Sequence, residues 1–178
     1  MKYLIASDIH GSAYYTQKVI DATLREGADT LVLLGDIFNH GPRNPLPKDY
    51  APLKVADMLN AIKDKLLVVK GNCDSEVDTL IAEFDFLPHL VIANEDKTIF
   101  CTHGHVYNKD QMPKQRYSAV VYGHFHTGFI DELDGAIVAN AGSVSLPKNN
   151  TPSSYLLFDG KVLSLRDIDG NVIKELAL

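Results

Sequence analysis

Short apolar runs and polar loops alternate along the first half of the chain. Residues 2–7, 30–34 and 65–70 are strand-sized apolar runs, and each leads directly into a polar loop that contains glycine. Between the first two runs, residues 13–25 read as a helix. Near-continuous apolar strands that alternate with helices predict a largely parallel sheet covered on both faces.

The second half of the chain is mostly strand-like. The expected strands are residues 90–93, 98–101, 119–122, 128–133, 137–139, 155–158 and 162–167. The turns 134–135 and 159–160 are Asp-Gly pairs, which favour hairpins. We therefore predict an α/β protein with two packed mixed sheets flanked by helices. No repeat, low-complexity tract or linker divides the chain, so residues 1–178 are predicted to form one domain.

The segment 40–52 is predicted to be a long ordered loop. It carries four of the eight prolines, which argues against a regular element, and it contains His40 and Arg43. Loops of this length within a domain are often functional. Because a guanidinium can hold a phosphate through two hydrogen bonds, His40 and Arg43 are predicted substrate-binding residues. The alternative is that both are solvated side chains of a surface loop.

Composition limits the location and the partners of the protein. The apolar runs are far shorter than the roughly 20 residues that span a bilayer, and Asp8 interrupts the first run before it could serve as a secretory signal. We expect a cytoplasmic protein without membrane contact. The two cysteines, Cys73 and Cys101, are too few for a disulfide framework and are expected as free thiols. A net charge of −6 argues against binding nucleic-acid polymers.

Seven polar side chains follow the apolar runs closely. They are Asp8, His10, Asp36, Asn72, His103, His124 and His126. The carboxyl ends of strands form the ligand-binding crevice of open α/β sheets, so these side chains are expected to converge. The two-residue spacing in Asp8-x-His10 and in His124-x-His126 predicts that each pair points to one side of an extended backbone and binds one ion. Carboxylate, imidazole and amide ligands suit Mn, Fe or Zn.

Glycines accompany these side chains almost everywhere. They are Gly11, Gly35, Gly71, Gly104 and Gly123. Glycine permits left-handed or tight backbone conformations and lets a ligand approach the chain closely. Their recurrence beside the polar residues strengthens the prediction of a metal site.

Five sequence blocks occur in a defined order along the chain. They are Asp8-x-His10, Gly35-Asp36, Gly71-Asn72, His103-Gly104 and Gly123-His124-x-His126. This ordered set resembles the calcineurin-like metallophosphoesterases. Segments 7–12, 39–44, 71–78 and 140–147 are similar, more closely, to the small bacterial phosphodiesterases of the YfcE type.

The resemblance implies an α/β/β/α sandwich and a site with two divalent metal ions. One ion would be held by Asp8, His10, Asp36 and His126, and the other by Asp36, Asn72, His103 and His124, so that Asp36 bridges them. Manganese is the foremost candidate, with Zn, Fe or Ni as alternatives. Two such cations lower the pKa of a water molecule and neutralise phosphoryl charge, which makes hydroxide the implied nucleophile.

Position 73 departs from the pattern of many larger relatives, which carry a histidine directly after the asparagine ligand. Our hypothesis is that the Cys73 thiol donates a proton to the leaving group less well than imidazole, so that aryl esters are favoured. The alternative is a small buried thiol. Asn72 and His105 complete the predicted catalytic residues, although His105 could equally be a neighbour of the site without a direct role.

Other polar residues are given supporting roles. His105, Asn140 and Ser143 are candidates to orient the ligating imidazoles through hydrogen bonds. Residues 109–116 are interpreted as a solvated helix face, and the acidic residues within 74–78 as the start of a helix.

The predicted function is hydrolysis of small phosphodiesters. A phosphomonoesterase at the same site is the alternative within the enzyme class. A non-catalytic metal-binding scaffold is the alternative from another class, and the acidic charge disfavours a nuclease. A homodimer or higher homo-oligomer is expected from how often proteins form symmetric oligomers.

Overall fold

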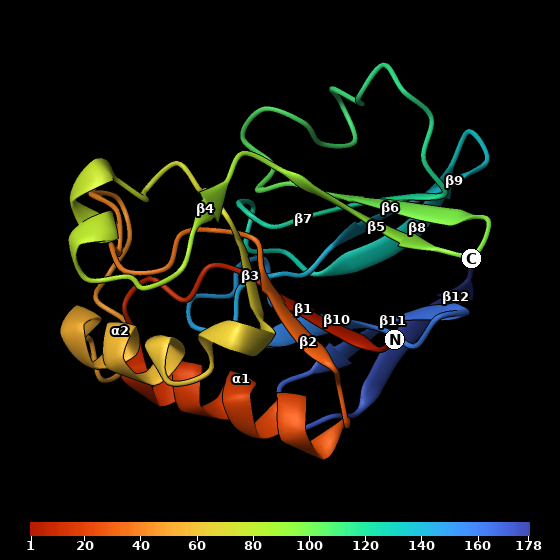
Figure 1. Cartoon of the computed structure of the whole chain (residues 1–178). Coiled ribbons are helices and arrows are strands. Elements are labelled where there is room, and N and C mark those ends of the chain that lie inside the picture. The colour runs from red at the N-terminus through yellow and green to blue at the C-terminus, as the bar shows by residue number, and fades with distance from the viewer.

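Two sheets pack face to face in the computed structural model, which describes residues 1–178 (Figure 1). The larger sheet has the order β12-β11-β10-β1-β2-β3-β4. Its strands are β1 (Tyr3–Ala6), β2 (Thr30–Leu33), β3 (Leu66–Val69), β4 (Phe86–Leu87), β10 (Ser154–Phe158), β11 (Val162–Asp167) and β12 (Val172–Ala177). Strands β1 to β4 are parallel, whereas β10, β11 and β12 are antiparallel to their neighbours.

The smaller sheet has the order β5-β6-β7-β9-β8. Its strands are β5 (Leu90–Asn94), β6 (Lys97–Cys101), β7 (Ala119–Tyr122), β8 (Phe129–Leu133) and β9 (Ala136–Asn140). The three central strands β6, β7 and β9 are parallel, and the edge strands β5 and β8 are antiparallel to them. Both sheets are therefore mixed, as predicted.

The helices lie on one side of the larger sheet (Figure 1). They are α1 (Ala13–Arg25), α2 (Pro52–Asn60) and the short 3-10 helices η1 (Lys63–Lys65) and η2 (Glu76–Leu80). Helix α1 begins after Ser12, whose side chain accepts the N–H of Tyr15, and it buries a stripe spaced by three residues that includes Thr16, Val19 and Ala22. None of the helices is both long and apolar enough to cross a membrane.

Three apolar layers hold the sandwich together. The first lies between the larger sheet and the helices and includes Leu33 and Leu59. The second joins the two sheets and includes Ile5 and Val121. The third is smaller and covers the outer face of the smaller sheet, where Phe100 contacts aromatic residues of the following loop, such as Tyr117. That outer face is covered by loop 102–118 rather than by helices (Figure 1).

The strand pattern predicted from the sequence is largely confirmed, but the two-residue strand β4 was not predicted and other differences occur. Helix α2 and strand β12 were missed; α2 follows directly on the proline-rich loop, and all but one residue of β12 is exposed, so its sequence carries no buried face. Residues 109–116 form a loop and not a helix. Asp74 does not begin a helix; it is buried, and only Glu76 and Asp78 lie in the first turn of η2.

Candidate metal centre

The seven side chains selected from the sequence lie at the carboxyl ends of parallel strands from both sheets. In the larger sheet Asp8 and His10 follow β1, Asp36 follows β2 and Asn72 follows β3; in the smaller sheet His103 follows β6, and His124 and His126 follow β7. Because the sheets pack with these ends together, residues more than 100 positions apart in the sequence come into contact, as His10 and His126 do.

The first cluster consists of Asp8, His10 and His126. The Oδ1 atom of Asp8 lies 3.3 Å from Nε2 of His126 and 3.6 Å from Nε2 of His10. The two Nε2 atoms are 3.1 Å apart. All three residues are buried, so three potential ligand atoms lie close together and shielded from bulk solvent.

The second cluster is built around Asp36 and His103. Oδ1 of Asp36 lies 3.4 Å from Nε2 of His103, which is also 3.0 Å from Oδ1 of Asn72. The other oxygen of Asp36, Oδ2, lies 3.7 Å from Nε2 of His10 in the first cluster. Asp36 therefore stands between the two clusters with one oxygen toward each. The ring of His124 packs beside that of His103, with 5.1 Å between centroids.

Backbone carbonyls orient three of the imidazoles. Nδ1 of His10, His103 and His126 each lies 2.7 Å from a carbonyl oxygen, of Asn39, Leu34 and Leu146 respectively. A carbonyl only accepts hydrogen bonds, so each Nδ1 carries a proton, and Nε2 is the atom that can offer a lone pair once its own proton is displaced by a metal ion. This is the arrangement in which metal-ligating histidines are usually held.

The cluster has the features that a cation requires. Oδ1 of Asp8 is buried and has no hydrogen-bond partner, which is costly for a carboxylate oxygen. The Nε2 atoms of His10 and His126 lie only 3.1 Å apart, close enough for one cation to contact both. A divalent cation between these atoms would satisfy all of them. The mixed oxygen and nitrogen donors fit a metal such as Mn, Fe or Zn.

The charges in the cluster shift its pKa values in opposite directions. Burial alone would raise the pKa of Asp8, but its contacts with His10 and His126 lower it well below the usual value. Burial likewise lowers the pKa of His103, but the contact with Asp36 and the charge of Asp8 outweigh it and raise the pKa to about 9. Both carboxylates, Asp8 and Asp36, thus favour the ionised form that binds a cation.

Comparison with known proteins shows where this arrangement occurs. Residues 1–161 match the model of the calcineurin-like phosphoesterase superfamily domain. The chain belongs to this superfamily. Phosphodiesterase YfcE of Escherichia coli K12 is 42% identical over 181 residues, which is 100% of this chain and 98% of YfcE. The solved structure of YfcE, a phosphoesterase, superposes with a TM-score of 0.95 at 41% identity and covers 99% of each chain.

More distant relatives share the architecture. The probable metallophosphoesterase YsnB of Bacillus subtilis is 27% identical over 99% of this chain and 96% of its own length. Vacuolar protein sorting 29 from Cryptosporidium parvum has a TM-score of 0.68 at 18% identity, over 99% of this chain and 98% of that one, and shows the fold alone. The family resemblance and the sandwich fold predicted from the sequence are confirmed.

The backbone around this phosphoesterase site is left-handed, not extended. Asp8, His10, Asp36, His124 and His126 have φ between 51° and 64°. Such conformations cost non-glycine residues about 1 kcal/mol or more and typically persist at functional sites. The prediction that the residues of each pair, Asp8-x-His10 and His124-x-His126, lie on an extended backbone was therefore wrong. His126 joins Asp8 and His10, whereas the ring of His124 turns toward His103.

At two positions of the site no residue larger than glycine would fit. A Cβ at Gly71 would overlap the carboxylate of Asp36, and a Cβ at Gly123 would overlap Ser7 and Asp8. Both carboxylates thus rest directly on glycine backbone. The sequence pattern of glycine beside each polar residue indicated this close approach correctly.

Asn140 and Ser143, which were proposed to orient the imidazoles, bind backbone carbonyl groups instead. Asn140 donates to the carbonyl of Gly123 at 2.7 Å, and Ser143 donates to the carbonyl of Asp8 at 2.8 Å. They fix the loops that carry ligands and contact no imidazole, because carbonyls already occupy the Nδ1 atoms. Ser145, which was not singled out, also donates to the carbonyl of Asp8, at 2.9 Å.

Asp74 is a second residue that the sequence interpretation missed. Its carboxylate accepts the backbone N–H groups of Asp36, Ile37 and Gly71 at 2.7–2.9 Å. Burial raises its pKa to about 6 against the effect of these donors. Asp74 therefore ties the loop after β2 to the loop after β3. The acidic run in the sequence gave no sign of this, since two of the three donors, Asp36 and Ile37, are far from Asp74 in the sequence.

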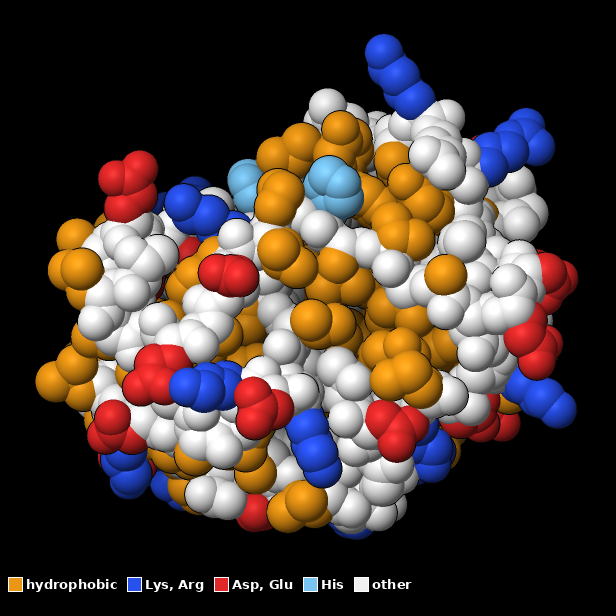
Figure 2. All heavy atoms as spheres, in the orientation of Figure 1, with side chains coloured by type: hydrophobic (Ala, Val, Ile, Leu, Met, Phe, Trp, Pro, Cys, Tyr) orange, Lys and Arg blue, Asp and Glu red, His pale blue; other side chains and the backbone are white.

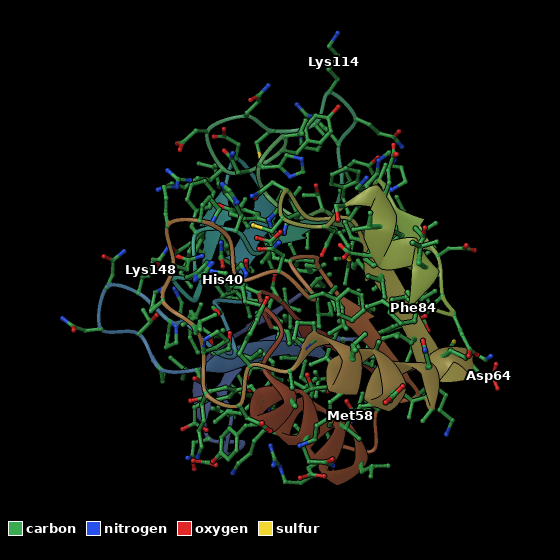
Figure 3. All side chains as sticks on the ribbon, turned by 90° about the vertical axis from the view of Figure 1, so that its left-hand side faces the viewer. His40, Met58, Asp64, Phe84, Lys114 and Lys148 are labelled. Carbon is green, nitrogen blue, oxygen red and sulfur yellow. The ribbon has the colours of Figure 1, made fainter.

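A cavity of about 600 Å³ opens beside the clusters and is lined by residues from four loops, those after β2, β3, β7 and β9. Its lining includes Asp36, Arg43, Asn72, Cys73, Phe125 and Lys148. Of the predicted substrate-binding residues, Arg43 lines this cavity but His40 does not. The ring of His40 instead packs edge-on against Tyr50, with 5.3 Å between centroids. Figure 3 shows Lys148, which was not predicted, on a loop that projects beyond His40.

Cys73 and His105 differ in their surroundings. The Cys73 backbone N–H donates to Oδ1 of Asp36 at 2.8 Å, and its thiol is near His10 and Asp36. Burial, followed by the charge of Asp36, raises the pKa of this thiol to about 12. His105 is exposed, with its ring 5.3 Å from that of His103. Both cysteines are free, and Cys101 is buried in the core.

Proposed function

We propose that this protein is a metal-dependent phosphodiesterase that hydrolyses small phosphodiesters at a dinuclear site. The observation that carries the proposal is the position of Asp36, whose two oxygens face His10 and His103 in two adjoining clusters of ligand atoms. The full-length similarity to phosphodiesterase YfcE supports the diester specificity. A carboxylate between two clusters is what a bridged pair of cations requires.

The proposed ligands of the first ion are Asp8, His10, Asp36 and His126. Those of the second are Asp36, Asn72, His103 and His124. His124 turns toward the second cluster, which supports its assignment there. Among divalent metals we propose Mn, with Zn, Fe or Ni able to use the same donors.

When bound, two such cations supply charge neutralisation at the phosphoryl group and lower the pKa of water. The residues of this chain then position the substrate. Arg43, on the wall of the cavity, holds a non-reacting phosphoryl oxygen. Asn72 also lines the cavity, and the contact of its Oδ1 atom with Nε2 of His103 keeps its side chain in position. Cys73 gives its proton to the leaving oxygen as the phosphorus–oxygen bond breaks. His105, whose ring lies 5.3 Å from that of His103, is a secondary candidate for a catalytic role.

Two other functions are weighed against a phosphodiesterase, one catalytic and one not. A phosphomonoesterase would need the same clusters and a smaller substrate. A non-catalytic scaffold could lose metal ligands and still bind its partner, so the retention of all seven side chains close together supports an enzyme. Polynucleotides are not the proposed substrate, because acidic and basic side chains alternate on the face in Figure 2 and leave no continuous basic track there.

The test compares hydrolysis of bis-p-nitrophenyl phosphate with that of p-nitrophenyl phosphate. Protein stripped with a chelator is assayed before and after addition of Mn, Zn, Fe, Ni or Mg. Faster cleavage of the diester that depends on added metal is the expected outcome. Faster cleavage of the monoester would establish the alternative enzyme, and inactivity with two metals bound would establish the scaffold. Added DNA should not compete.

The surroundings of the proposed enzyme follow from its composition. We propose a cytoplasmic protein whose partner is a small diester, with no membrane contact. A homodimer or higher homo-oligomer is proposed from the frequency of symmetric assemblies. Light scattering at several concentrations measures the assembly directly.

A further inference from the structure

Phe125 occupies an unusual position for an aromatic side chain. It lies between His124 and His126, two of the proposed ligands, and its side chain lines the cavity beside the clusters. It is 47% exposed. A single exposed phenylalanine needs no explanation by itself. This one, however, is exposed at the opening of the proposed reaction site.

The ring of Phe125 is held in place by two neighbours. It packs nearly perpendicular to His124, with 5.0 Å between centroids, and to Tyr122, with 6.0 Å. The backbone N–H of Phe125 donates to the carbonyl of Gly123 at 2.7 Å. Because these contacts already order the ring, a ligand that packs on its free surface loses little side-chain entropy in the protein.

The rest of the cavity divides into polar and apolar parts. Asp36, Asn72 and His124 provide the polar interior, next to the proposed metal positions. Pro42 and Pro45, from the loop after β2, line the same cavity and are exposed. The opening thus combines the Phe125 ring, on the loop after β7, with the prolines on the loop after β2, and the exposed basic side chains of Arg43 and Lys148 line the same cavity. A phosphate group suits the interior, and a flat apolar group suits the opening.

We infer that Phe125 is a stacking platform for a planar aromatic substituent of the phosphodiester, such as an aryl ester or a nucleobase. This inference rests on the proposed function and names the substrate class of the same site. Aromatic stacking does not depend on which aromatic group is present, because every such ring has a π-face. Phe125 therefore selects aromatic over alkyl diesters.

The test uses diesters that share one leaving group. Methyl p-nitrophenyl phosphate, phenyl p-nitrophenyl phosphate and the p-nitrophenyl ester of thymidine 5′-monophosphate all release p-nitrophenol, so leaving-group chemistry cancels in their ratios. Kinetics are measured for the wild type, for Phe125→Leu, which removes the ring, and for Phe125→Tyr, which keeps it. Bound metal is measured by mass spectrometry for each variant.

In Phe125→Leu the ratio of kcat/KM for at least one aromatic ester to that of the methyl ester should fall about fivefold or more. Phe125→Tyr should retain the wild-type ratio. A fall with the phenyl ester places the aromatic group directly on the phosphate, and a fall with the thymidine ester places it at nucleoside distance. Unchanged ratios for both esters in Phe125→Leu would overturn the platform.

A measurement on the wild type does not depend on how the variants fold. Phenylphosphonate should inhibit hydrolysis of the methyl ester at a concentration about fivefold lower than methylphosphonate does. Equal inhibition by the two would overturn the inference. Failure of the proposed function would give a different result, in which the metal-loaded wild type cleaves none of the three diesters.

Discussion

The carboxylate of Asp74 accepts the backbone N–H of Asp36 at 2.9 Å, so one acidic residue holds another in position. The same Asp74 oxygen accepts the N–H of Gly71 at 2.7 Å. The loop with the proposed bridging carboxylate and the loop with Asn72 are therefore tied through one buried side chain. Asp74 acts on the site by positioning.

Replacing Asp74 should weaken metal binding as well as stability. Asp74→Ala leaves three buried N–H groups without an acceptor, each at a cost of about 1–3 kcal/mol, and should lower the melting temperature by several degrees. Titration with Mn²⁺ should show an affinity reduced at least tenfold. Asp78→Ala is the matched control, since Asp78 accepts only from Ser75. If both variants bind Mn²⁺ as the wild type does, Asp74 serves stability alone.

Metal should stabilise the protein through the first cluster. Chelator-stripped protein is expected to gain melting temperature on addition of Mn²⁺, because a ligand that binds only the folded state adds stability in proportion to the logarithm of its concentration. His126→Ala should reduce or abolish this gain. His89→Ala, whose ring packs on Phe100 outside the site, should retain it. An equal gain in both variants would contradict the assignment of His126.

The Cys73 thiol is expected to matter most for poor leaving groups. Burial and the charge of Asp36 raise its pKa, so the thiol is protonated at neutral pH and has a proton to give. Cys73→Ala should slow diesters with alkyl leaving groups more than those with p-nitrophenol, which needs no proton. Rates for the two classes are compared at constant metal occupancy. A proportional loss in both classes would exclude Cys73 as the donor.

Arg43 and Lys148 should contribute to substrate affinity. Both line the cavity, and hydrogen bonds to a charged partner are worth about 1.5–3 kcal/mol. Arg43→Ala is expected to raise KM for a diester about tenfold, and Lys148→Ala somewhat less, with bound metal unchanged. Arg116→Ala, an exposed arginine that lines a different cavity, is the control. Steady-state kinetics at two salt concentrations show whether the effect is electrostatic.

Much of this protein could be predicted from local sequence. The apolar runs before Asp8, Asp36 and Asn72 indicated both the strands and the edge at which these side chains meet. This succeeded because a buried parallel strand must be apolar throughout, and its carboxyl end is set by where that run stops. The ligand types could be inferred because carboxylates and imidazoles are rarely placed together without a chemical reason.

The tertiary structure alone decided which partner each side chain meets. His124 and His126 are two residues apart and turn to different clusters, because both have a left-handed backbone that breaks the strand geometry. The carbonyl of Leu146 orients His126, and Asp74 binds N–H groups that lie far away in sequence. Any residue has a carbonyl and an N–H, so the sequence carries no signal for such contacts. Packing brought them together, and it also left Phe125 exposed at the opening of the site.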